Sequence, residues 1–158
     1  MTGIPSKYYL PFADALVEVL QQFGVSEITK NNMELKKSLY MDYEVCLIVG
    51  ITNDVQGNIG ISMPTSTAIN IASIAMGGME ITEMDDMSQS ALSEISNMVA
   101  ATATRKLSDM DKNSDITPPT MVMGEKLMMI ISQVDTISLS LKSAAGVIQL
   151  DIGLENVS

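Results

Sequence analysis

A serine, a glutamate and an asparagine recur at helical spacing near the middle of the sequence, and together they can act on a bound molecule. Ser90, Glu94 and Asn97 stand at positions i, i+4 and i+7, which places them on one face of a helix. At about 100° per residue, Glu94 and Asn97 point roughly 60° apart. A carboxylate can pair with a cation of a partner, and a side-chain amide can hold a water molecule as donor and acceptor at once. On spacing alone, a plain solvated helix face remains the alternative.

The residues that continue this stripe are small. Ala101 and Thr104 follow on the same face, and small neighbours let the backbone of another molecule come close to the acid and the amide. The opposite side of the pattern is apolar, with residues Leu92, Ile95, Val99 and Ala103. We therefore predict an amphipathic helix with one narrow polar stripe that a partner can approach.

Chemistry that needs other residue types is excluded. The sequence has no histidine and one cysteine, Cys46, so an imidazole base, a Ser-His-Asp triad, a histidine-ligated metal and a disulfide framework are ruled out. Cys46 lies in the apolar run from Val45 to Val49, which indicates a buried structural thiol. The phosphate-loop pattern G-x-x-x-x-G-K-[ST] is also missing. We expect this chain to hold no cofactor or metal of its own.

Size and charge narrow the class of protein. The chain has 158 residues, 46% of them apolar, and a formal net charge of −10 with a pI near 4.2. We expect one domain over residues 1–158, whose negative field disfavours nucleic acid and anionic membrane surfaces as partners. The longest apolar run is far too short to span a membrane, and the first residues lack the layout of a signal peptide. A cytoplasmic protein is expected.

The polar stripe lies in the longest of three predicted helices. Apolar residues at helical spacing predict helices over residues 10–23, 65–76 and 84–107. In the second helix, Thr65 is the predicted N-cap and Gly77-Gly78 the stop.

The remaining segments favour strands. Alternation and turn residues predict strands over residues 44–51, 57–63, 120–123, 126–131, 136–141 and 146–154. The pattern of residues 28–43 is mixed, and residues 109–117 are expected to be a polar linker. The order of elements predicts an α+β fold with helices packed on an antiparallel sheet.

Two further patterns carry structural expectations. Met84, Met87 and Met98 recur at helical spacing, and we expect them to fill the core. Lys36-Lys37 and Arg105-Lys106 are short basic pairs, which we expect to be solvated.

Several linked motifs give this chain a resemblance to a known family. Ser90-x3-Glu94-x2-Asn97, followed after 21 residues by Pro119-Thr120-Met121-Val122-Met123-Gly124, resembles the signature of the CheC/CheX/FliY chemotaxis phosphatases. Residues 50–62 resemble the hairpin that precedes the helices in the CheX branch, and Pro11-Phe12 and Gly153-Leu154-Glu155 are also similar to that branch. The resemblance therefore covers most of the chain.

The resemblance implies a fold, an activity and residue roles. Members of this family have an α+β fold with internal pseudo-symmetry, bind a phosphorylated CheY-type response regulator and speed hydrolysis of its aspartyl phosphate. By this resemblance, Asn97 orients the attacking water, Glu94 pairs with the active-site lysine of the receiver, and Ser90 is a supporting position. Ala101 is expected to be a binding position because it is a small residue on the same stripe. The resemblance assigns the Mg²⁺ to the receiver. Because an acyl phosphate is already activated, alignment of the water is most of the catalytic task.

A second stripe with the same spacing lies in the first predicted helix. Asp14-x3-Glu18-x2-Gln21 has glutamine in place of asparagine, so its amide stands on a longer stem. We expect solvated acids of an amphipathic helix here and a working site on the long helix alone. Whether Asp14, Glu18 and Gln21 form a degenerate second site stays open.

Other functional interpretations also stay open. The chain can be a non-catalytic CheC-like adaptor that binds a receiver or a flagellar-switch protein, or its stripe can be plain surface. The presence of both Glu94 and Asn97 favours the enzyme, because an adaptor has no need for the amide. The resemblance also implies a homodimer joined through sheet edges, which would cover an exposed strand. The sequence does not identify the receiver, the rate or an activating partner.

Overall fold

The central sheet is assembled from strands that are distant in the sequence. The computed structural model describes residues 4–126 and 128–157. Within them, a seven-stranded antiparallel sheet has the order β1-β8-β9-β4-β3-β5, with β6 also paired to β3. The strands are β1 (Thr29–Lys36), β3 (Val45–Asn53), β4 (Val55–Met63), β5 (Ser114–Ile116), β6 (Thr120–Met123), β8 (Thr136–Ser143) and β9 (Gly146–Asn156).

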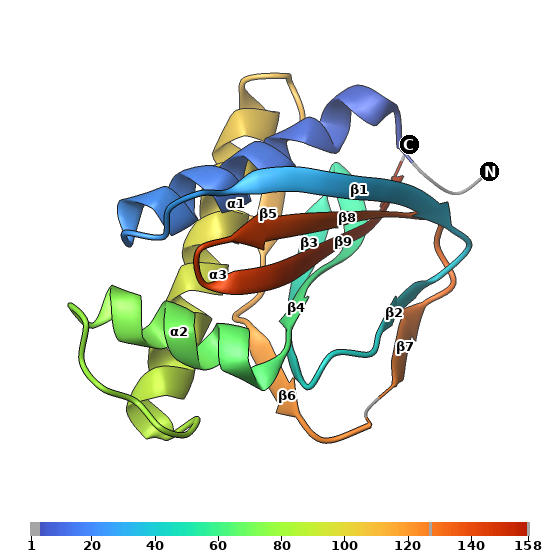
Figure 1. Ribbon diagram of the computed structural model, residues 1–158. Helices are drawn as coiled ribbons and strands as arrows, with labels where there is room; N and C mark the ends of the chain where they lie inside the picture. Colours follow the sequence, from blue (N-terminus) through green and yellow to red (C-terminus); the bar gives the residue numbers. More distant parts are fainter. Residues whose placement is uncertain (1–3, 127, 158) are drawn as a thin grey trace.

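The helices cover one face of this sheet. A short 3-10 helix, η1 (Ser6–Tyr8), leads into α1 (Leu10–Gln22), which lies beside α3 (Asp86–Ser108), and α2 (Thr65–Ala75) also contacts α3 (Figure 1). Their apolar sides and the facing strand residues form one main core. The predicted α+β fold with helices on an antiparallel sheet is confirmed.

A small two-stranded sheet packs against the opposite face. It consists of β2 (Leu39–Met41) and β7 (Met129–Ser132). Leu39 and Met41 pack with Cys46 in a second, smaller core, so the prediction of a buried thiol is confirmed. The two sheets pack closely at this point, because a Cβ at Gly60 of β4 would lie only 2.7 Å from the Met41 Sδ of β2.

The structure corrects three local predictions. The second helix begins at Thr65 with Pro64 as its N-cap, so Thr65 is not the cap; its backbone N–H instead donates to Glu44 Oε1 at 2.9 Å. Residues 109–117 are not simply a linker, because β5 pairs there with the end of β3. Of the strand predicted over residues 126–131, Leu127 lies outside the described residues, and the observed β7 begins only at Met129.

Among residues 4–126 and 128–157, no helix combines the length and the apolar composition needed to cross a bilayer.

Candidate functional site

Local interactions at both ends of α3 define where its polar stripe lies. The Asp85 carboxylate caps the helix by accepting hydrogen bonds from the Ser88 backbone N at 2.9 Å and from Ser88 Oγ at 2.7 Å. These bonds, the one from the hydroxyl foremost, lower the pKa of Asp85 because they favour its charged form. Arg105 and Lys106 stand in the last turn, where positive charge complements the helix dipole.

The four predicted site residues lie on α3 as the sequence pattern placed them. Ser90 and Glu94 are exposed, and Asn97 and Ala101 are half-buried. The apolar residues predicted for the opposite side are all buried, namely Leu92, Ile95, Val99 and Ala103. The helix therefore presents its narrow polar stripe outward while its other side packs into the main core.

The acid and the amide of this stripe are not engaged by the rest of the chain. Among the described residues, the side chains of Glu94 and Asn97 make no hydrogen bond or ion pair. Their charge and hydrogen-bonding capacity are therefore available to another molecule, as the interpretation of a binding stripe requires.

An open depression adjoins the N-terminal half of the stripe. It is shallow and is lined by Asp86, Met87, Ser90, Ala91 and Glu94. Met87 is 57% exposed, so the expectation that it fills the core is wrong. By contrast, Met84 and Met98 pack against the core as expected. The helix turns Met87 outward because it stands seven residues before Glu94 and shares its face.

The second part of the signature lies on strands beside α3. The Thr117 hydroxyl accepts a hydrogen bond from the Gly50 backbone N at 2.8 Å, and the Thr117 backbone N donates to the Gly50 carbonyl at 2.9 Å. This pair holds the chain against the edge of β3 just before Pro118-Pro119. Because β5 and β6 both contact α3, residues after Asn97 return to the flank of the helix that carries it.

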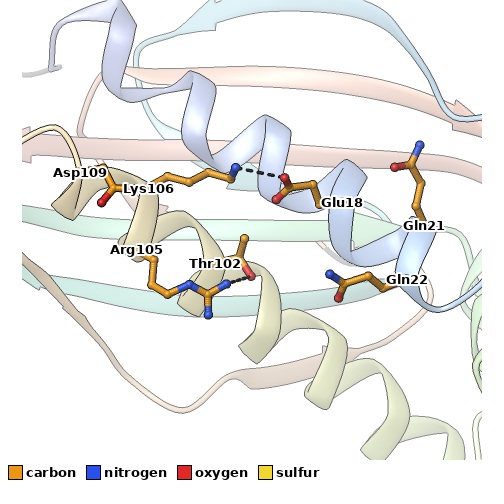
Figure 2. Close-up of a pocket in the computed structure, with 7 residues that line it drawn as sticks. All are labelled: Glu18, Gln21, Gln22, Thr102, Arg105, Lys106 and Asp109. Atoms are coloured by element: carbon orange, nitrogen blue, oxygen red, sulfur yellow. Dashed lines mark hydrogen bonds and ion pairs between the residues drawn. The ribbon is translucent and has the colours of Figure 1, made fainter.

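The second stripe lies on α1, directly beside α3, and its acids are paired. Asp14, Glu18 and Gln21 are all exposed, as predicted. Glu18 Oε1 lies 3.2 Å from Lys106 Nζ, and Asp14 Oδ1 lies 3.5 Å from Lys30 Nζ. Figure 2 shows Lys106 reaching across from α3 to α1 along a groove of about 680 Å³. The two stripes therefore differ, since only the α3 stripe has a free acid.

The sequence interpretation missed a buried polar group on the sheet face opposite the helices. Asp151 of β9 is fully buried and pairs with Lys36 Nζ at 3.3 Å, and Gln149 Nε2 donates to it at 3.1 Å. The Lys36 side chain is 8% exposed, so its expected solvation is wrong. Burial raises the pKa of Asp151, although hydrogen bonds from Ser138 and Gln149 and the charge of Lys36 act in the opposite direction.

A pattern in the strands pointed to this buried group. Polar residues stand at every second position, with Ser138 and Ser140 in β8 and Gln149 and Asp151 in β9, so each strand has a polar face. The cluster lies on the other side of the sheet from α3, and therefore takes no part in the stripe.

In the part of the chain that the structure describes, no group of three or more histidine, cysteine, aspartate or glutamate side chains is placed to hold a metal ion.

Comparisons with known proteins give the chain a family. The sequence model of "Chemotaxis phosphatase CheX" matches residues 45–141. The "CheY-P phosphatase CheX" of Thermotoga maritima is 38% identical over 85 residues, which are 54% of this chain and 55% of that relative. The aligned part therefore spans about half the length of the curated relative.

Solved structures share the fold along nearly the whole chain. The chemotaxis protein CheX of Desulfovibrio desulfuricans has a TM-score of 0.85 at 23% identity, covering 94% of this chain and 99% of that one. The CheX of a CheX–CheY–BeF3–Mg²⁺ complex from Borrelia burgdorferi has a TM-score of 0.75 at 29% identity, covering 94% and 98%. With a family match over more than half of its residues, this chain belongs to the CheX family.

Proposed function

We propose that this chain is a phosphatase that hydrolyses the aspartyl phosphate of a CheY-type response regulator. The observation that carries the proposal is the free acid and amide of Glu94 and Asn97 on the exposed stripe of α3, in a chain of the CheX family. The name of the Thermotoga relative and the CheX–CheY complex from Borrelia support the same substrate class.

Asn97 is proposed to act on the attacking water. When α3 docks, its amide accepts from and donates to a water molecule and aligns it with phosphorus. The water oxygen bonds to phosphorus while the bond from phosphorus to the aspartyl oxygen breaks, and its electron pair stays on the carboxylate. Inorganic phosphate leaves as H2PO4−, which carries the oxygen and both protons of the water. The Mg²⁺ belongs to the receiver, so at the reacting atoms this chain contributes only the positioning of the water.

Glu94 is proposed to fix the docked geometry. Its free carboxylate pairs with the active-site lysine of the receiver, a charge-assisted contact that is stronger than a neutral hydrogen bond. Ser90 and Ala101 lie on the same stripe and support docking, because a small side chain lets the receiver backbone approach.

The lifetime of the phosphorylated receiver tests the proposal. A Mg²⁺-bound CheY-type receiver from the same genome is phosphorylated, and its decay is followed with the wild-type protein, with Asn97→Ala and with neither. We expect faster decay with the wild-type protein and loss of at least about a hundredfold of that acceleration in Asn97→Ala. Docking of the variant should remain close to that of the wild type.

The same assay separates the phosphatase from an adaptor. Binding of the receiver without any change in the decay rate would overturn the phosphatase in favour of a non-catalytic adaptor. Full activity of Asn97→Ala would show that the assigned role of the amide is wrong.

We also propose that the protein works as a homodimer in the cytoplasm, where its receiver substrate acts. Among the described residues, β1 pairs with β8 on one side only. Its apolar residues Met33 and Leu35 are 67% and 65% exposed, and such an edge favours pairing with another strand.

A further inference from the structure

The N-terminal half of α3 and the loop before it carry several acids and no basic residue. Residues 80–97 contain the acids Glu80, Glu83, Asp85, Asp86 and Glu94. No lysine or arginine occurs anywhere between Lys37 and Arg105. A partner surface that docks here therefore meets negative charge, and complementarity requires positive charge on the partner.

The depression in this region combines that charge with exposed apolar surface. Asp86 and Glu94 stand at its two ends, and Met87 and Ala91 line it between them. Met87 keeps 57% of its surface exposed. A thioether side chain is flexible and fits irregular apolar surfaces, and its burial against a partner is favourable.

One cation cannot serve both ends of this depression. Asp86 and Glu94 are eight residues apart, which is about 12 Å along a helix. If Glu94 takes the active-site lysine of the receiver, the end formed by Asp86 and Met87 remains open to a second side chain. The lining of this end suits a lysine or arginine side chain. Such a side chain buries its aliphatic stem against apolar surface and keeps its charged group at a polar rim.

We infer that Asp86 and Met87 form a second anchor site that binds a surface lysine or arginine of the receiver. The aliphatic stem of that residue packs on Met87 and Ala91, and its charge pairs with Asp86. This inference rests on the proposed docking of a receiver through Glu94. It makes Asp86 and Met87 specificity-determining residues, which select receivers by a cation outside the active site and leave the chemical step to Asn97.

Steady-state kinetics with the phosphorylated receiver test this anchor. We expect Met87→Ser to raise KM about tenfold, the effect of losing most of one buried apolar side chain. Asp86→Asn should raise KM about two- to fivefold at low ionic strength and flatten its dependence on salt. Because neither residue touches the reacting atoms, kcat should stay at the wild-type value in both variants.

Matched controls lie on the opposite side of the sheet. Met128→Ser and Asp42→Asn make the same chemical changes at exposed positions next to β7 and β2, and we expect unchanged kinetics from both. Thermal unfolding of each variant checks that the helix start remains intact, since Asp86 stands in the first turn of α3.

Direct titration separates failure of the anchor from failure of the phosphatase. The same receiver is activated with beryllofluoride and Mg²⁺ and its Kd is measured. Weaker binding by both variants supports the anchor even if the wild-type protein does not speed decay. Unchanged KM and Kd in both variants overturn it, and so does a wild-type protein that binds no receiver. An effect of Met87→Ser without one of Asp86→Asn overturns the cationic occupant in favour of an apolar one.

Discussion

Glu94 on α3 and Glu18 on α1 are the middle residues of two motifs with the same spacing, but their surroundings differ. Glu94 has no partner among the described residues, whereas Glu18 pairs with Lys106 across the helix interface. Both carboxylates are exposed. At the scale of single residues, availability to a partner therefore distinguishes the two stripes better than spacing does.

The same change from glutamate to glutamine should therefore affect receiver binding at Glu94 but not at Glu18. Glu94→Gln should weaken binding of an activated receiver by roughly tenfold or more, because a charge-assisted contact contributes about 1.5–3 kcal/mol. Glu18→Gln removes only an exposed ion pair, which is worth at most about 1 kcal/mol to folding, and should leave binding unchanged. Titration of the receiver into each variant measures both effects. Equal losses in the two variants would show that α1 also docks a receiver.

At the scale of elements, the buried pair of Lys36 and Asp151 links the edge of the sheet to its middle. Lys36 ends β1, and Asp151 lies in β9, where it is fully buried. Lys36 Nζ also lies 3.9 Å from the centroid of the Tyr40 ring of β2. The pair therefore connects three strands at the point where the small β2–β7 sheet packs on the large one.

Loss of this cation should destabilise the fold in a way that depends on pH. Lys36→Met leaves an uncompensated buried carboxylate and should cost about 3–5 kcal/mol of unfolding free energy near neutral pH. Burial raises the pKa of Asp151 above that of an aspartate in the unfolded chain. In the wild type, the folded state therefore holds this proton more tightly than the unfolded state does. That contribution to stability is lost as pH rises through the raised pKa. The penalty of Lys36→Met should shrink as pH falls, because protonated Asp151 needs no cation.

Urea unfolding of both lysine variants across the acidic range measures this effect. Lys37→Met is the matched control, because Lys37 is its exposed neighbour, and its stability should stay within about 0.5 kcal/mol of the wild type. A penalty for Lys36→Met that is small or independent of pH would contradict the role of the pair.

At the scale of the whole molecule, the proposed homodimer rests on the open edge of the sheet at β1. The double variant Met33→Lys/Leu35→Lys puts two charges on β1, which should prevent edge pairing by repulsion. Sedimentation should show about twice the 17.0 kDa of one chain for the wild type and a single chain for the variant. A wild-type protein that sediments as one chain would contradict the dimer. Receiver docking should persist in the variant, because α3 packs at the other end of the sheet.

The elements with strong local signals were predicted closely. Regular apolar spacing predicted a helix over residues 10–23, against the observed α1 of Leu10–Gln22. The stripe of α3 was placed correctly for the same reason, since 3.6 residues per turn determine which side chains share a face. Elements without such signals were missed, above all β5, whose residues Ser114–Ile116 are polar enough to suggest a linker.

The sequence by itself determined the α+β class, the polar stripe and the exclusion of histidine chemistry, because residue type and helical periodicity are local properties. Only the tertiary structure decided that Glu18 is paired, that Lys36 is buried and that Met87 is exposed. Each of these outcomes depends on a neighbour far away in the chain, or on which side of a helix remains uncovered after packing. Burial and pairing are properties of the assembled layers.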